Sequence, residues 1–134
     1  MQVKADRYCF ACGADNPQGL HLQFRTEGEE YVCDYTPAPE HQGWQDVVHG
    51  GIAATVLDEV MTRLLWEQGL EAVTARLSVR YRQPVPVGRP ANARARLVRR
   101  RGRLVEVASE LRLEDGSVAT EAEGTFLILP QASE

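Results

Sequence analysis

The stretch GIAATVLDEVMTRLLWEQ, residues 51–68, decides the fold that the sequence predicts. Apolar residues recur in it at intervals of three and four positions, which is the spacing of one face of an α-helix. They are Ile52, Val56, Leu57, Val60, Met61, Leu64 and Leu65. Gly69 follows the last turn, in a position typical of a helix C-terminus. So broad an apolar face has to be buried, and the rest of the chain must supply the surface that covers it.

Beyond residue 72 the period of the apolar positions changes from helical to two, which indicates β-strands. The alternation covers four stretches, residues 73–81, 91–98, 105–113 and 118–129. In the first of them Val73, Leu77, Val79 and Tyr81 fall in the apolar row, and Thr74 falls in the polar row.

The last three strands follow one another through tight reversals at Arg101-Gly102 and Asp115-Gly116. Connections this short join antiparallel neighbours, because parallel strands need a crossover between them. Two shorter strands, His21–Arg25 and Tyr31–Tyr35, precede the helix. We therefore predict an α+β fold in which a curved antiparallel β-sheet wraps one long central helix. The small residues Ala91, Ala93 and Ala95 suit a strand lying close against that helix.

Length and composition narrow the class of protein. A chain of 134 residues predicts a single domain over residues 1–134, with a turn-rich N-terminal segment at 1–20. The net charge of −4 argues against a nucleic-acid partner. No apolar run approaches the roughly 18 residues of a membrane span, and the first residues lack the apolar core of a secretion signal. We therefore expect no membrane partner and a cytoplasmic location.

Three cysteines, Cys9, Cys12 and Cys33, do not suggest a disulfide framework in a chain without an export signal. Cys9 and Cys12 have the two-residue gap of a zinc knuckle, and His21 and Cys33 would complete a set of four ligands. A second tight pair of ligands is missing, so we predict no metal site and interpret the thiols as buried or turn-lining groups.

His49-Gly50-Gly51 stands immediately before the helix. Successive glycines let a ligand approach the backbone closely, and the first amides of a helix have no partner within it. These amides lie at the positive end of the helix dipole, where they can stabilise a carbonyl oxygen that gains negative charge. The alternative is a plain glycine turn at a helix N-terminus. His49 is interpreted as a support of this turn, although an imidazole can also act as a base.

Two carboxylates on the helix are candidates for the reacting group. Asp58 falls at the margin of the apolar stripe, beside Ala54 and Leu65, where partial loss of water would raise its basicity. Glu59 falls on the opposite margin and is a rival. Helix spacing alone does not separate these two carboxylates from each other, or from ordinary surface acids.

The chain resembles the hotdog-fold acyl-CoA thioesterases of the PaaI-like group. The main element is H-x-G-(x5)-H-G-G-(x6)-D, at His41, Gly43, His49, Gly50, Gly51 and Asp58. Supporting elements are C-F-x-C-G-x-x-N-P-x-G-L at Cys9–Leu20, V-R-Y-R-x-P-V-P-V-G at Val79–Gly88, and G-T-F at Gly124–Phe126. The similarity runs over nearly the whole chain.

The resemblance implies roles for individual residues. Gly50 would polarise the thioester carbonyl through its N–H, Asp58 would activate water or attack directly, and His49 would support the turn. Thr74 would help to place the water, from a partner subunit. Gly51, Gly43 and His41 are assigned to substrate binding. Some relatives carry an asparagine where this chain has Gly43, and Gln42, Gln45 or His41 would fill that role.

The resemblance also implies a use for the arginine-rich stretch between residues 89 and 103, which composition alone would place on a solvated sheet face. Coenzyme A carries phosphates, for which arginine is suited. The candidates are Arg82, Arg99, Arg100, Arg101 and Arg103. Homodimers joined edge to edge, or tetramers built from two such dimers, are implied as well, with active sites at the dimer interface. Trp44, Trp66 and Met61 are possible lining residues, and burial in the core or at a subunit contact is the alternative for each.

Hydrolysis of an acyl-CoA thioester to free acid and CoA is therefore the leading hypothesis, with no cofactor beyond the CoA of the substrate. A hydratase or dehydratase acting on enoyl thioesters is one alternative, which would use His49 with an acid for proton transfer. A non-catalytic acyl-CoA binding protein is the other, and such a sensor would need an output domain.

Overall fold

The computed structural model describes residues 3–130. Its long helix, α1, runs over Gly50–Glu67 and begins one residue earlier than predicted. His49 is the N-cap, and its Nδ1 accepts a hydrogen bond from the Gly51 N–H at 2.9 Å. Gly69 has a φ of +81°, a left-handed conformation that glycine adopts at little cost, and there the chain leaves the helix. The predicted helix is confirmed.

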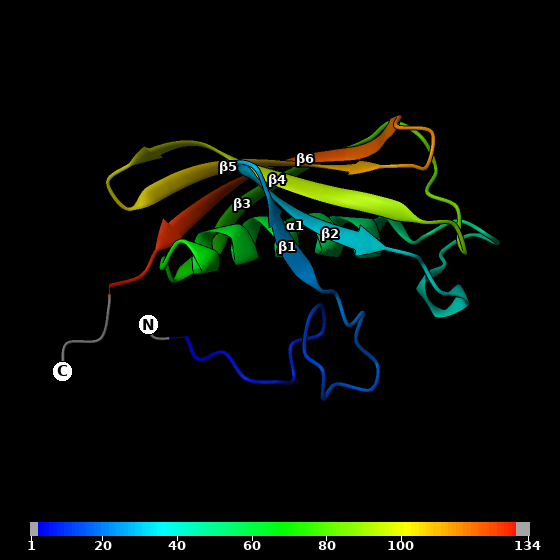
Figure 1. Cartoon of the computed structure of the whole chain (residues 1–134), viewed down its shortest axis with the longest axis horizontal. Helices are drawn as coiled ribbons and strands as arrows, with labels where there is room; N and C mark the ends of the chain where they lie inside the picture. The colour runs from blue at the N-terminus through cyan, green and yellow to red at the C-terminus, as the bar shows by residue number, and fades with distance from the viewer. Residues whose placement is uncertain (1–2, 131–134) are drawn as a thin grey trace.

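Six strands form one antiparallel sheet that curves over α1 (Figure 1). The elements before the helix are β1 (Phe24–Glu27), β2 (Glu30–Tyr35) and a short 3-10 helix η1 (Pro39–His41). Those after it are β3 (Ala72–Tyr81), β4 (Ala91–Arg101), β5 (Leu104–Arg112) and β6 (Val118–Ile128). The strand order is β1-β2-β4-β5-β6-β3, so β3 lies at one edge of the sheet.

The core lies between α1 and the inner rows of this sheet. Every predicted apolar position of the helix except Ile52 is at most 5% exposed. Opposite them are Val105, Val107, Leu111 and Phe126, together with the three alanines of β4, all at most 6% exposed. Burying one such valine, leucine or phenylalanine side chain stabilises the fold by about 1.5–3 kcal/mol. The expected α+β arrangement, with small residues beneath the helix, is confirmed.

The first predicted strand is wrong at its start. The strand β1 begins at Phe24 rather than His21, because the preceding residues bond to the N-terminal segment. The Leu22 N–H donates to the Ala11 carbonyl at 2.9 Å, and His21 has a φ of +53°. The N-terminal segment therefore returns along α1, on the side away from the sheet (Figure 1).

None of the helices among residues 3–130 has a stretch that is both long and apolar enough to cross a bilayer. Met61 is completely buried in the core, which agrees with the alternative to a place in a pocket lining. Trp44 is the opposite case, because 86% of it is exposed, and Trp66 is 40% exposed.

Candidate active site

A β-bulge in β3 turns one polar side chain toward the helix. The register of β3 against β6 shifts between Thr74 and Arg76, so Ala75 is an extra residue in the ladder. Thr74 pairs with the buried Phe126, and Leu77 pairs with Gly124 in the same inner row. The simple alternation predicted Thr74 on the outer face; the extra residue reverses the side on which it lies.

Thr74 consequently meets Asp58. Its hydroxyl donates a hydrogen bond to Asp58 Oδ1 at 2.8 Å. Thr74 and Asp58 of one chain thus contact each other, and the contribution of Thr74 to a site shared with a partner subunit stays a prediction. Asp58 is half-buried, and this burial raises the pKa of its carboxyl, while the Thr74 hydrogen bond acts to lower it. No ion pair of Asp58 exists among the described residues.

Glu59, the rival carboxylate, points elsewhere. The Cys12 thiol donates to Glu59 Oε1 at 3.1 Å, and the Cys9 thiol lies 3.9 Å from the same oxygen. Burial raises the pKa of Glu59 as well. The two acids thus face different surroundings: Asp58 is next to the edge strand, and Glu59 is closed off by the N-terminal segment. These contacts separate the two acids, which helix spacing could not do, and Asp58 is the carboxylate next to the sheet edge.

The turn before α1 leaves one amide free. The Gly51 N–H is bound by the His49 ring, and the Ile52 and Ala53 N–H groups donate to the His49 carbonyl at 2.9 and 3.1 Å. The Gly50 N–H has no acceptor among residues 3–130. Since Nδ1 of His49 accepts a hydrogen bond, the imidazole is held in a fixed orientation. The supporting role predicted for His49 agrees with this contact.

Tyr81 is a member of this turn that the sequence did not single out. Its hydroxyl donates to the Gly50 carbonyl at 2.7 Å, and its ring lies against the Gly50 backbone. It was predicted only as part of the apolar row of its strand. The available signal was that a tyrosine hydroxyl in such a row needs a polar partner, although nothing in the sequence identifies that partner.

The loop before the turn is held by its own contacts. A side chain on Gly43 would come within 3.1 Å of the His49 backbone, so this glycine permits a close approach. The His41 carbonyl accepts the His49 N–H at 2.8 Å, and the His41 ring bonds to the Tyr35 hydroxyl at 2.9 Å. The Gln42 side chain accepts the Asp46 N–H. His41, Gly43 and Gln42 therefore shape the turn, and their assignment to substrate binding stays a prediction.

Gly50 and Asp58 do not form one contact site within the chain. They are eight positions apart on the same helix, which corresponds to about 12 Å along the axis. One carbonyl group cannot touch both, because a reacting carboxylate or its water must lie about 3 Å from the carbonyl carbon. The chain therefore carries two half-sites: a donor half at Gly50 with Tyr81, and an acid half at Asp58 with Thr74.

The predicted arginines differ in their partners. Arg82 and Arg99 are already neutralised by ion pairs, with Glu121 at 2.6 Å and with Glu106 at 2.7 Å. Arg100 and Arg103 bond only to backbone carbonyl groups, and Arg101 has no partner among the described residues. The β4–β5 hairpin that carries residues 99–103 lies at the opposite end of α1 from Gly50 (Figure 1). Gly50, Arg99 and Arg101 are thus not brought together by one chain.

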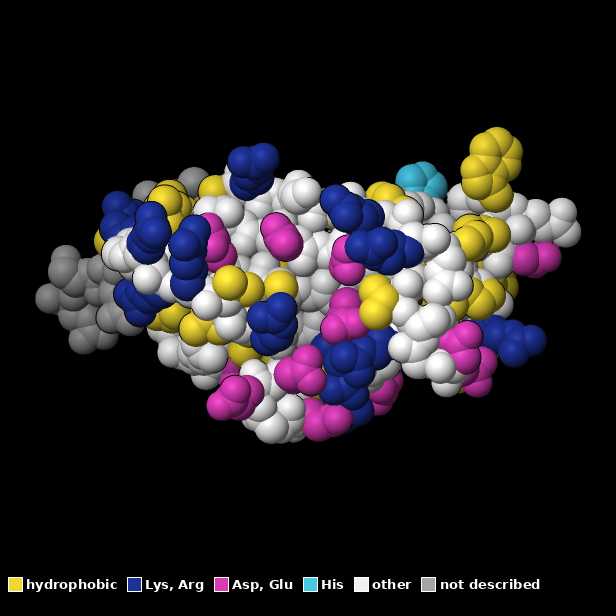
Figure 2. Space-filling view, turned by 90° about the horizontal axis from the view of Figure 1, so that it is seen from above, with side chains coloured by type: hydrophobic (Ala, Val, Ile, Leu, Met, Phe, Trp, Pro, Cys, Tyr) yellow, Lys and Arg dark blue, Asp and Glu magenta, His cyan; other side chains and the backbone are white. Residues whose placement is uncertain are grey.

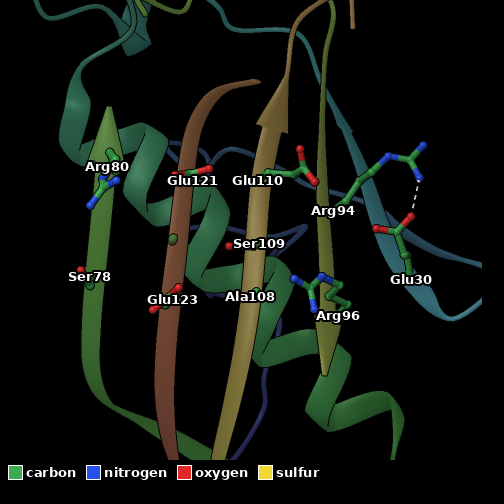
Figure 3. A pocket seen from close by; sticks show the side chains of 11 residues that line it. Glu30, Ser78, Arg80, Arg94, Arg96, Ala108, Ser109, Glu110, Glu121 and Glu123 are labelled. Carbon is green, nitrogen blue, oxygen red and sulfur yellow. Dashed lines mark hydrogen bonds and ion pairs between the residues drawn. The ribbon is translucent and has the colours of Figure 1, made fainter. Parts of the chain in front are cut away.

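The outer face of the sheet carries a mixture of basic and acidic side chains, with basic ones gathered toward the β4–β5 end (Figure 2). A polar pocket opens on this face, and Arg94 is paired there with Glu30 at 3.1 Å (Figure 3). Arg80, Arg96 and Glu123 also line it. This pocket lies on the side of the sheet away from α1, so it contacts neither half-site.

Comparison with known proteins identifies the class to which this fold and these half-sites belong. A family model of the thioesterase superfamily matches residues 45–120. The chain belongs to the thioesterase superfamily, and the predicted resemblance is confirmed.

Individual proteins similar to this chain are thioesterases or proteins of the PaaI group. The chain is 30% identical over 99 residues to acyl-coenzyme A thioesterase THEM4 of Xenopus laevis, covering 73% of this chain and 45% of that protein. A solved thioesterase superfamily protein, RHA08564, is 29% identical with a TM-score of 0.85. The match covers 90% of this chain and 63% of the chain of RHA08564. The PaaI protein of the E. coli phenylacetic acid degradation operon is 16% identical with a TM-score of 0.78. The match covers 84% of this chain and 83% of the PaaI chain. The chain therefore spans about half of the curated relative, and the hotdog fold is confirmed.

The Thr74 contact makes a prediction about Asp58. Thr74→Val removes the hydroxyl that favours the ionised carboxylate, so the pKa of Asp58 should rise and its titration should move to higher pH. Thr74→Ser keeps a donor and is the matched control. The carboxyl carbon shift of Asp58, followed by NMR as a function of pH, measures this directly. An unchanged or lower pKa in Thr74→Val would show that the hydrogen bond has no influence on the carboxyl.

Proposed function

We propose that this protein hydrolyses acyl-CoA thioesters to a free acid and CoA. The observation that carries the proposal is the pair of half-sites: a half-buried carboxylate held by a hydroxyl at Asp58 and Thr74, and a free amide at Gly50. A thioester hydrolase needs a group that activates water and a donor for the oxygen that becomes negative. The THEM4 relative is named an acyl-coenzyme A thioesterase, which supports this substrate class.

In this proposal each half-site takes one part of the reaction. Thr74 occupies Oδ1 of Asp58, which leaves Oδ2 to accept a proton from water. The water oxygen bonds to the carbonyl carbon while the Gly50 N–H stabilises the oxyanion. The carbon–sulfur bond then breaks, and the proton held by Asp58 passes to the sulfur of CoA. His49 and Tyr81 act by positioning Gly50, through the capping bond and the bond to its carbonyl.

A second copy of the chain would join the two half-sites. The strand β3 is a ten-residue edge of the sheet, and a long unpaired edge is a template for pairing. Antiparallel pairing of β3 with its own copy places the start of one strand opposite the end of the other. Thr74 of one copy then lies opposite the Val79–Tyr81 region of the second, where Tyr81 holds Gly50. A homodimer of this kind thus builds each site from both copies, and two dimers can associate further into a tetramer.

Coenzyme A is the proposed ligand of this composite site. Two solved relatives support it: a Streptococcus pneumoniae hypothetical thioesterase with coenzyme A, and smu.793 of Streptococcus mutans with acetyl CoA, each 16% identical to this chain. The S. pneumoniae protein was also solved as alanine variants of an aspartate and a threonine that are 16 positions apart, the separation of Asp58 and Thr74.

For the phosphates of CoA we favour Arg100, Arg101 and Arg103, since none of these three is paired with an acid in the described part of the chain. Arg82 and Arg99 would first have to leave their glutamates. The β4–β5 hairpin lies on the same side as Thr74, because β5 pairs at Leu104 with Leu127 of β6, which pairs with Val73.

Loss of the acid should abolish hydrolysis. Asp58→Asn keeps the shape of the side chain but cannot take a proton, so the rate should fall by on the order of a hundredfold or more. Release of CoA from a panel of acyl-CoA substrates, measured by chromatography, gives the rate. Glu123→Gln, on the outer face of the sheet, is the control and should retain full activity. Full activity in Asp58→Asn and Asp58→Ala would exclude this mechanism.

The same panel distinguishes the alternative functions. Hydration of an enoyl thioester that depends more on His49 than on Asp58 would indicate a hydratase. Acyl-CoA binding without release of CoA and without hydration would indicate a binding protein.

The N–H of Gly50 can be removed without changing Asp58. Proline has no N–H and is tolerated at the first position of a helix, and His49 already has the extended conformation that a following proline requires, with ψ of 130°. Gly50→Pro should therefore keep the fold and lower the rate by about a hundredfold to a thousandfold. Gly50→Ala keeps the N–H and should lose much less. Equal activities in the two variants would show that the Gly50 amide does not contact the reacting oxygen.

A further inference from the structure

Two cysteines and one glutamate converge on the side of α1 away from Thr74. Cys9 and Cys12 come from the N-terminal segment, and Glu59 comes from the middle of the helix. The Cys12 sulfur lies 3.1 Å and the Cys9 sulfur 3.9 Å from Glu59 Oε1, and the three ligand atoms all lie within 4.8 Å of one another. None of these groups has a part in the proposed hydrolysis.

The spacing of these atoms fits a tetrahedral metal ion. With zinc–sulfur bonds of about 2.3 Å and zinc–oxygen bonds of about 2.0 Å, tetrahedral angles put sulfur and oxygen about 3.5 Å apart. The two observed sulfur–oxygen distances lie on either side of that value. Ligand atoms that already surround one point need only small side-chain rotations to hold an ion.

The carboxylate of Glu59 is a second reason to expect a bound cation in this cluster. Glu59 is half-buried and has no ion pair among the described residues. Arg63, one turn further along α1, stacks over the Phe24 ring at 5.5 Å, and its charge lowers the pKa of Glu59 without forming an ion pair with it. A carboxylate removed from water without a partner is costly, and a divalent ion would bind its oxygen directly. With two thiolates the complex keeps a charge of −1, the same charge as the carboxylate alone.

The loop that carries the two cysteines is fixed by its backbone. The Gly13 N–H donates to the Cys9 carbonyl at 2.8 Å, and a side chain on Gly13 would collide with backbone atoms of Cys9 at 2.4 Å. The carbonyl groups of Phe10 and Ala11 accept hydrogen bonds from Leu20 and Leu22. The thiols are therefore presented from a rigid turn, which lowers the entropy cost of binding an ion.

We propose that Cys9, Cys12 and Glu59 bind a Zn²⁺ ion that fastens the N-terminal segment to α1. The two thiols release their protons to solvent and bind as thiolates, the glutamate supplies one oxygen, and water takes the fourth position. This differs from the ligand set considered from the sequence. Cys33 lies in β2, where its thiol contacts the Asp34 carbonyl, and His21 bonds to the Asn16 carbonyl.

The site would have a structural role. Glu59 directly follows Asp58 on α1, so the ion would tie residues 9–13 to the turn of the helix that carries the acid half-site. Soft thiolate ligands favour zinc over magnesium or calcium, which prefer oxygen.

The test uses the full chain, kept reduced and freed of metal with a chelator. Titration with Co²⁺ should give a thiolate-to-cobalt charge-transfer band that saturates at one ion per chain, and Zn²⁺ should displace it. Cys9→Ser and Cys12→Ser should lose the band, and Cys33→Ala, outside the cluster, should keep it. Glu59→Gln keeps both thiols and the side-chain volume and should weaken binding by at least about tenfold. Zn²⁺ should raise the melting temperature of the parent chain and leave that of Cys12→Ser unchanged.

Three results would overturn the proposal. They are the absence of a charge-transfer band in the reduced parent chain, a band that persists in Cys9→Ser and Cys12→Ser, and equal affinity of Glu59→Gln and the parent. Circular dichroism of each metal-free variant establishes that it is folded. Glu59→Gln, which removes a half-buried charge without removing volume, keeps the test decisive if a cysteine variant fails to fold.

Discussion

The apolar face of α1 is buried against the inner rows of β4, β5 and β6, and this contact fixes the rotation of the helix about its axis. Once that face points to the sheet, the directions of the side chains at its two margins are fixed. Asp58 is turned toward β3, and Glu59 is turned toward the N-terminal segment. The same contact sets the depth of both acids, and partial burial raises the pKa of each. A single packing interface thus gives two neighbouring carboxylates different partners and different chemistry.

The helix also separates the groups that the proposed reaction needs. The free amide is at its first residue and the acid is in its middle, about 12 Å further along the axis. Bringing them to one substrate requires two helices, and the exposed edge of β3 offers the means. Thr74 and Tyr81 lie near the two ends of that strand, each bonded to one half-site. Pairing of the edge with a copy of itself unites them, so oligomerisation and catalysis depend on the same strand in this proposal.

Sequence patterns predicted the helix and the long strands because their apolar periods are regular over many residues. They failed where a single residue changes the geometry. The bulge at Ala75 leaves the composition of β3 unaltered and yet reverses the side on which Thr74 lies. Contacts between residues far apart in the sequence could not be predicted either. Nothing in the order of residues indicates that Glu59 contacts Cys12, or that Arg82 is neutralised by Glu121. The motif at residues 49–58 pointed to the groups used in the proposed reaction, and only the helix geometry divided them into two half-sites.

The composite nature of the site is tested most directly by mixing two inactive chains. Asp58→Asn retains the donor half, and Gly50→Pro retains the acid half. After unfolding together and refolding at equal amounts, half of the dimers should contain one chain of each kind, and each of these should have one intact site of two. About a quarter of the parental rate of CoA release should then return, as two-fold symmetry of the dimer requires. No recovery in mixed dimers, demonstrated by differently tagged chains, would contradict the account and place both halves of the site in one chain.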